Sequence, residues 1–164
     1  MTLAARPYAP IALAAAAAVL VGALGGLMTD IGPWYQALDK PDWQPPDWLF
    51  GPVWTAIYAL TAAAAVLSWR ASSTVISRQN LLILFLMNAT LNVVWSLLFF
   101  RLRRPDWALF EVVFLWVSII ALILACRRRD VRAAWLLAPY LAWVTFAAFL
   151  NYTIVSLNRP FTGL

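Results

Sequence analysis

The sequence predicts an all-α integral membrane protein, a bundle of five transmembrane helices with a structured first loop, forming a single membrane domain over residues 1–164. Of its residues, 64% are hydrophobic and only 12% are charged, and the mean hydropathy is +0.79. A soluble domain is nearer half apolar and a quarter charged. The apolar residues also gather in five long runs. Each run is about 20 residues or longer, which is the length that a helix needs to cross a bilayer.

The charged residues that bound these runs set the limits of the expected helices. In chain order, we expect the spans over residues 8–28, 49–69, 79–100, 107–126 and 133–157. The connection over residues 29–48 is the one long loop, and its aspartates place it in water. Because the other connections are short, we expect sequential helices to pack antiparallel.

The first run follows Arg6 and shares the small residues of a secretory signal. Its length and the two prolines at its start, Pro7 and Pro10, favour a retained span instead. Within the run, Gly22 and Gly26 have the small-xxx-small spacing of close helix contacts. Two interpretations stay open: packing within one bundle, which we favour, and a contact between the subunits of a dimer.

The stretch from residue 34 to residue 54 has the most unusual composition, with four tryptophans, four prolines and four charged residues. Proline restricts φ and removes backbone donors, so the stretch is expected to be stiff. Tryptophan combines a large apolar body with one N–H group, which suits a membrane interface or a flat aromatic ligand. Gly51 and Pro52 then open the second span, because proline is tolerated in the first turn of a helix.

The polar side chains inside the expected spans include two asparagines of the third span and one carboxyl group of the fourth. Asn88 and Asn92 are four residues apart and therefore share one face of the third helix. Lipid offers them no partner. They either link helices, which we favour, or bind the polar atoms of a ligand. Glu111 lies one turn inside the fourth span and is expected to reach the membrane interface.

The ten tryptophans divide by position. Four lie at the ends of spans, where indoles anchor at the membrane surface: Trp48, Trp69, Trp107 and Trp135. Four lie deeper: Trp54, Trp95, Trp116 and Trp143. Tyr58 is one turn from Trp54, and Ala147, which leaves room, is one turn from Trp143. These faces fit a cavity for a flat hydrophobic molecule or a dense aromatic core equally well.

Charge and composition exclude several classes of function. The net charge of +5 comes from arginines in short loops at span ends, which is the topology signal of membrane proteins, so we expect no nucleic-acid partner. Seven arginines on the side of the N-terminus against five basic residues on the other side favour a cytoplasmic N-terminus and an external first loop. With no histidine, His-based haem ligation, triads and most zinc sites are excluded, and we expect no metal and no cofactor. The single cysteine, Cys126, excludes an intrachain disulfide.

Several motifs along the chain share one resemblance. They are Trp34-Tyr35-x-x-Leu38-x-Lys40-Pro41-x-Trp43-x-Pro45-Pro46-x-Trp48, Gly51-Pro52-Val53-Trp54, Leu91-Asn92-x-x-Trp95, Trp107-Ala108-Leu109, Pro139-Tyr140-Leu141-Ala142-Trp143 and Leu150-Asn151-Tyr152. In this order and spacing they resemble the translocator proteins, also called tryptophan-rich sensory proteins or peripheral-type benzodiazepine receptors (the TspO/MBR family). The resemblance covers nearly the whole chain.

The resemblance implies a membrane receptor, sensor or carrier, often a homodimer in the lipid bilayer. Such proteins bind porphyrins such as protoporphyrin IX, haem-related tetrapyrroles and other flat hydrophobic molecules in a pocket inside the bundle, under the first loop. Carried over to this chain, the ligand-binding residues are Tyr35, Trp43, Trp54, Asn88, Asn92, Trp107, Trp143, Ala147 and Leu150.

The resemblance also implies an alternative function, a light- and oxygen-dependent degradation of porphyrin in which Trp54 and Trp143 are the catalytic residues. A purely structural role of the aromatic residues is a third interpretation. Animal members carry a sterol-recognition motif at the end of the fifth span. Here Leu150 and Tyr152 are followed by Arg159, one position beyond the usual limit, which argues against cholesterol and favours a bacterial source.

Overall fold

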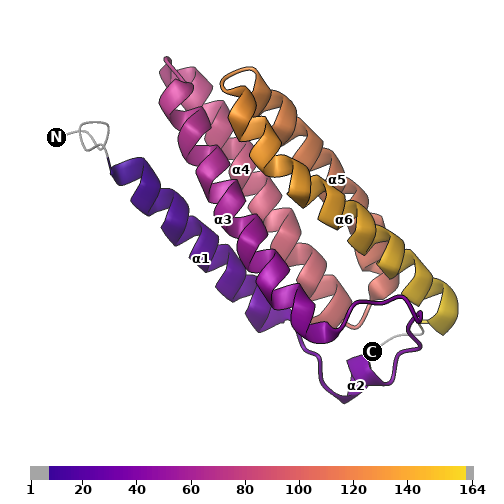
Figure 1. Ribbon diagram of the computed structural model, residues 1–164. Coiled ribbons are helices and arrows are strands. Elements are labelled where there is room, and N and C mark those ends of the chain that lie inside the picture. The colour runs from indigo at the N-terminus through magenta and orange to yellow at the C-terminus, as the bar shows by residue number, and fades with distance from the viewer. Residues whose placement is uncertain (1–7, 162–164) are drawn as a thin grey trace.

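The computed structural model describes residues 8–161 and consists of long helices packed side by side (Figure 1). The long helices are α1 (Ala9–Met28), α3 (Asp47–Ala71), α4 (Val75–Ser96), α5 (Pro105–Arg127) and α6 (Val131–Asn158). Among the described residues, five helical segments are long and apolar enough to cross a membrane. The predicted all-α, five-span fold is therefore confirmed. Arg6, which suggested a signal, and Pro7, which argued against one, lie outside the described residues.

Helices α4 and α6 begin earlier than the apolar runs because polar side chains cap them. Helix α4 starts four residues before the expected span, where the Thr74 hydroxyl accepts the amide N–H of Ser77 at 3.1 Å. Helix α6 starts two residues early, where the Asp130 carboxylate accepts the amide N–H of Arg132 at 2.9 Å. Such side-chain caps satisfy amides that a helix start leaves unpaired. Hydropathy thus predicted where the spans lie, and the side-chain caps set the first residues of α4 and α6.

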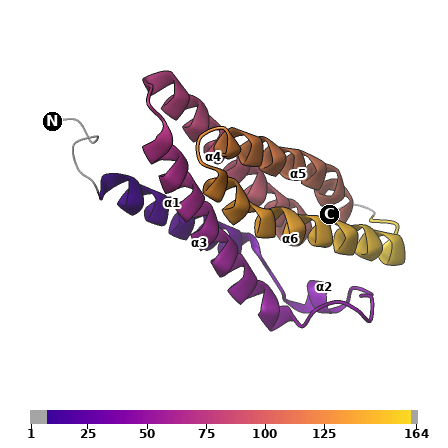
Figure 2. The ribbon, with the colours of Figure 1, turned by 45° about the horizontal axis from the view of Figure 1, so that its top comes forward.

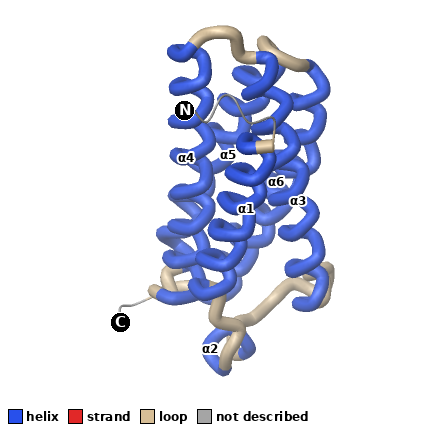
Figure 3. Tube along the Cα trace, turned by 90° about the vertical axis from the view of Figure 1, so that its left-hand side faces the viewer, coloured by secondary structure: helices blue, strands red, loops and turns tan. Residues whose placement is uncertain are grey.

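The order of the helices around the bundle differs from their order in the chain. Helix α1 packs on α3, α3 on α6, α6 on α5, α5 on α4, and α4 returns to α1. Helices α3 and α4 follow each other in sequence but touch only slightly. Viewed from its own side, α1 lies between them (Figure 3). The expectation that sequential helices pack together therefore holds for α4, α5 and α6 and is wrong for α3 and α4.

Helix α1 is the least buried of the long helices, and Gly25 is its one buried residue. A Cβ atom on Gly22 would lie 3.3 Å from the Tyr58 ring, so α1 approaches α3 closely at this point. A Cβ atom on Gly26 would meet no atom within 4 Å. The interpretation as packing within the bundle is thus supported for Gly22. For Gly26, a contact between subunits stays a prediction.

The first loop is ordered by hydrogen bonds at what we call the loop end of the bundle, where the short helix α2 (Pro33–Gln36) lies (Figure 2). The Asn158 side chain accepts the amide N–H of Asp39 and donates to its carbonyl oxygen, each at 2.8 Å. The Tyr35 hydroxyl donates to Asp47 and accepts from Gln44, each at 3.1 Å. Burial and the nearby Asp47 carboxylate raise the pKa of Tyr35 to about 12.

The opposite end, which we call the arginine end, holds the α3–α4 and α5–α6 connections. Arg129 joins them. Its guanidinium donates to the hydroxyls of Ser72 and Ser77 at 3.0 and 3.2 Å, to the carbonyl of Ser77 at 3.0 Å and to that of Ala125 at 2.6 Å. One side chain therefore connects the ends of three helices, α3, α4 and α5.

Replacing Arg129 by alanine is expected to lower the melting temperature. Losing charged hydrogen bonds of this kind costs about 2–3 kcal/mol, which corresponds to roughly 5 °C or more for a chain of this length. Thermal unfolding in detergent, followed by tryptophan fluorescence, measures the shift. The matched control is Arg128→Ala, because Arg128 is an exposed neighbour. Equal melting temperatures for the two variants would contradict the role given to Arg129.

Candidate functional site

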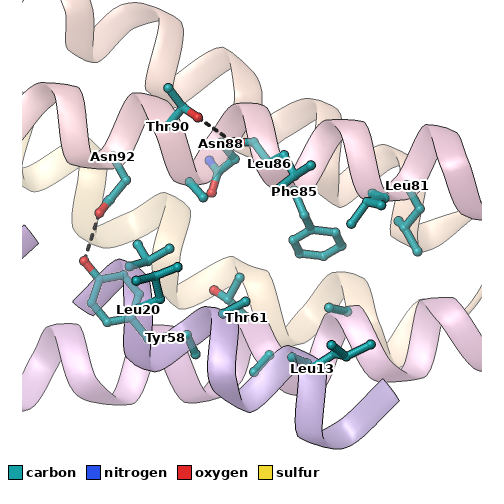
Figure 4. Close-up of a pocket in the computed structure, with 18 of the residues that line it drawn as sticks. Leu13, Leu20, Tyr58, Thr61, Leu81, Phe85, Leu86, Asn88, Thr90 and Asn92 are labelled. Carbon is teal, nitrogen blue, oxygen red and sulfur yellow. Dashed lines mark hydrogen bonds between the residues drawn. The ribbon is translucent and has the colours of Figure 1, made fainter. Parts of the chain in front are cut away.

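A cavity of about 570 Å³ lies between α1, α3 and α4 (Figure 4). Its walls are mainly aliphatic and aromatic, and Tyr140 contributes to it from α6. It extends from the level of Pro10 and Trp69, near the arginine end, to that of Tyr58 and Asn92. The cavity therefore follows the line along which α3 and α4 stay apart.

Small side chains explain why this space is not filled. The face of α1 that lines the cavity includes Ala14, Ala17 and Ala18, and that of α3 includes Ala62 and Ala65. Alanine reaches little beyond the backbone, so these helices cannot close the gap to α4. The alanine-rich composition of the first span thus has a structural consequence.

A chain of hydrogen bonds borders the cavity toward the loop end. The Tyr58 hydroxyl donates to the side-chain oxygen of Asn92 at 2.8 Å, as Figure 4 shows, and the Asn92 amide donates to the Tyr140 hydroxyl at 3.2 Å. Trp54 stacks on the Tyr58 ring, with centroids 5.5 Å apart, and meets Tyr140 edge-on at 6.1 Å. Trp54 therefore does not line the cavity itself but contacts Tyr58, which does.

Asn88 and Asn92 link helices and also line the cavity. The Asn88 amide donates to the Ser118 hydroxyl on α5 at 2.8 Å. Asn92 joins α4 to α3 and α6 through its two tyrosines. The favoured interpretation, hydrogen bonding between helices, is confirmed. The Thr61 hydroxyl, in contrast, is a buried polar group of the wall for which the described residues supply no partner.

Other site residues expected from the family resemblance gather under the first loop, outside the lining of this cavity. Trp43 stacks on Phe149 at 5.2 Å and meets Phe146 edge-on at 5.9 Å. Trp143 contacts the same Phe146 at 5.4 Å and Phe50 at 5.5 Å. Phe146 thus connects the two tryptophans into one aromatic cluster beneath the loop.

The remaining expected residues occupy three different environments. Tyr35 and Leu150 are buried in a common apolar cluster with Phe99. Ala147 is half-buried on α6. Trp107 is 51% exposed and lies under the guanidinium of Arg104, 4.1 Å from the ring centroid. The structure therefore places Asn88 and Asn92 in the cavity wall and distributes the other seven expected residues over its surroundings and the loop end.

Glu111 does not reach the membrane interface, so that expectation is wrong. The residue is only 7% exposed, and both carboxyl oxygens are buried with no hydrogen-bond partner among the described residues. The reason is the position of α5, which packs on both α4 and α6 and turns this face inward. The buried indole nitrogens of Trp95 and Trp143 are likewise unpaired within the described chain.

Sequence reasoning missed several residues of the cavity wall. On α4, Leu81, Leu82 and Phe85 line the cavity together with Asn88 and Asn92. These positions recur at intervals of three and four residues, which is the spacing of one helix face. Extending the face back from the two asparagines would have identified them.

Comparison with known proteins defines the family. The sequence model of the TspO/MBR family matches residues 13–157, which run from α1 through α6. The chain belongs to the TspO/MBR family. Because its described helices include five that are long and apolar enough to cross a membrane, this TspO/MBR protein is an integral, multi-pass membrane protein.

The relatives of this TspO/MBR chain come from distant organisms. The tryptophan-rich protein TspO of Chlorobaculum tepidum is 42% identical over 76% of this chain and 79% of its own. The tryptophan-rich sensory protein of Cereibacter sphaeroides is 36% identical over 77% of this chain and 79% of its own. The human translocator protein is 34% identical over 79% of this chain and 78% of its own. The names of these relatives describe sensing and translocation.

Proposed function

We propose that this protein is a membrane receptor, sensor or carrier that binds a tetrapyrrole or a similar flat hydrophobic molecule in the cavity between α1, α3 and α4. The observation that carries the proposal is the cavity itself. Its volume of about 570 Å³ lies within the roughly 300–1,000 Å³ of sites for small molecules. Its mainly apolar wall with a few polar groups is also typical of such sites.

The wall suits a flat ring system with a few polar atoms. Tyr58, Trp69 and Phe85 offer aromatic surfaces from α3 and α4. The unpaired hydroxyl of Thr61 can donate to or accept from a bound molecule. Protoporphyrin IX, the ligand that the family resemblance suggests, combines a flat macrocycle with polar groups and is the probe of choice.

Filling the cavity is expected to weaken binding. Ala89 lines the cavity from α4, and a phenylalanine there would occupy ligand volume. We expect Ala89→Phe to raise the Kd for protoporphyrin IX by about tenfold or more, since lost burial of one ring-sized contact costs about 1.5–3 kcal/mol. Quenching of tryptophan fluorescence in detergent measures the Kd. Ala59→Phe, at an exposed position of α3 outside the cavity lining, is the matched control.

The same measurement separates this cavity from a pocket under the first loop. Ala147 lies outside the cavity lining. A loss of binding in Ala147→Phe with normal binding in Ala89→Phe would place the ligand under the loop. Normal binding in both variants would contradict an intra-bundle site.

A second candidate function is a light-dependent oxidation of bound porphyrin, and the stack of Trp54 on Tyr58 favours it because this indole lies one ring away from the cavity. Dioxygen would be the oxidant and the porphyrin the group oxidised. In the simplest balanced reaction, both oxygen atoms of one dioxygen add across a methine C=C bond, which breaks to give two carbonyl groups. The indole would return unchanged.

Illumination of the porphyrin complex tests this second function. We expect Trp54→Phe to slow the loss of the Soret band more than Trp143→Phe, because Trp143 does not line the cavity. A sample without oxygen is the control. Equal bleaching in the wild type and both variants, with no defined product, would identify the protein as a binding protein only.

We propose that the arginine end faces the cytoplasm, because cytoplasmic loops are enriched in lysine and arginine. The exposed Ser73 in the α3–α4 connection is a suitable position for a label. The one native cysteine, Cys126, is buried and gives a low background. In Ser73→Cys, a membrane-impermeant maleimide is expected to react in inverted vesicles and not in intact cells. The reverse pattern would show the opposite orientation.

A further inference from the structure

A cationic side chain begins the helix face that lines the cavity. Arg78 lies in the first turn of α4, and Leu81, Leu82 and Phe85 follow it at three, four and seven residues. Residues at this spacing share one helix face. All three of the following residues line the cavity. Because side chains on a helix lean toward its N-terminus, the guanidinium of Arg78 belongs to the arginine end of this face.

The guanidinium also contacts the cavity wall. The Cζ atom of Arg78 lies 5.3 Å from the ring centroid of Trp69, and Trp69 lines the cavity from α3. The Nε atom of Arg78 is buried and has no hydrogen-bond partner among the described residues. A buried donor without a partner is costly, so a bound anion that drew this N–H group out of the wall would offset that cost.

No acidic side chain of the described chain compensates Arg78. The ion pairs found over residues 8–161 are Arg104–Asp106 and Arg132–Asp130. Asp130, the acidic residue of the arginine end, is bound to Arg132 at 2.9 Å. An arginine without a carboxylate therefore stands at one end of an apolar cavity. Its planar fork matches a carboxylate or a phosphate.

We propose that Arg78 binds the acidic group of an amphiphilic ligand whose apolar body lies in the cavity. The inference rests on the proposed function and specifies it, because it predicts that the ligand's acidic groups point toward the arginine end. Arg78 and Asn92 are 14 residues apart, about 21 Å along the helix at 1.5 Å per residue. That length accommodates a tetrapyrrole with its carboxylates at one edge. A phosphate of a membrane lipid has the same anionic chemistry and is the other source.

The experiment compares acidic and neutral forms of one ring system in phosphatidylcholine nanodiscs. Protoporphyrin IX is the diacid, and its dimethyl ester is the neutral form. We expect the wild type to bind the diacid about tenfold tighter, as one charged hydrogen bond provides. Arg78→Gln is expected to lose this preference and to bind the ester like the wild type. Arg128→Gln, an exposed arginine at the same end, is expected to keep the preference.

A second measurement distinguishes the two sources of the anion. Native mass spectrometry records how much phosphatidylglycerol and phosphatidylcholine each variant retains. If Arg78→Gln loses the preference for the diacid, the site recognises the carboxylate of the ligand; if it loses only a preference for phosphatidylglycerol, the site recognises a lipid phosphate. If Arg78→Gln keeps both preferences, the inference is overturned, even if the result for Ala89→Phe supports the cavity. Absence of saturable porphyrin binding in the wild type refutes the proposed function alone, and the lipid measurement then decides on Arg78.

Discussion

The bilayer supplies no hydrogen bonds, so polar groups inside the bundle must bond to one another. Where α3, α4 and α6 meet, Asn92 provides these bonds. Asn92 accepts from Tyr58 of α3 and donates to Tyr140 of α6, so that one amide joins three helices. Helices α3 and α4 otherwise touch only slightly. The length of the Tyr58 side chain therefore sets their separation, and the cavity occupies the space that results. The hydrogen bond between Tyr58 and Asn92 thus keeps α3 and α4 apart and leaves space for an apolar site.

One wall of the cavity is formed by α1, the least buried of the long helices. Helix α1 has one buried residue and packs chiefly on α3 and α4. It approaches α3 closely at Gly22, where an added Cβ atom would lie 3.3 Å from the Tyr58 ring. Tyr58 therefore contacts α1 through its ring and donates a hydrogen bond to Asn92 through its hydroxyl. The loop end, in contrast, is held by the reciprocal bonds of Asn158 with Asp39.

Hydropathy was sufficient to predict the five spans, because the membrane requires long apolar helices and the charges mark their ends. It was also sufficient to predict that Asn88 and Asn92 face inward. It could not show which helices are neighbours, because these helices are apolar on nearly all sides and no stripe marks the core-facing side. For the same reason the inward position of Glu111 was missed, since one turn from the helix start is compatible with either face. The separation of α3 and α4 depends on tertiary packing that no single span encodes.

The buried polar groups that lack a partner among the described residues lie either outside the cavity lining or at its wall. Their position decides whether a ligand in the cavity could bond to them. Glu111, Trp95 and Trp143 lie outside the cavity lining, so each costs stability on the order of 1–3 kcal/mol that a ligand in the cavity does not offset. Thr61 lines the cavity, and Arg78 contacts its wall through Trp69. A molecule in the cavity that formed hydrogen bonds with these two groups would offset their cost. The same feature that costs the bundle stability would therefore favour the proposed ligand, which carries a hydrogen-bonding group near its middle and an acidic group at one end.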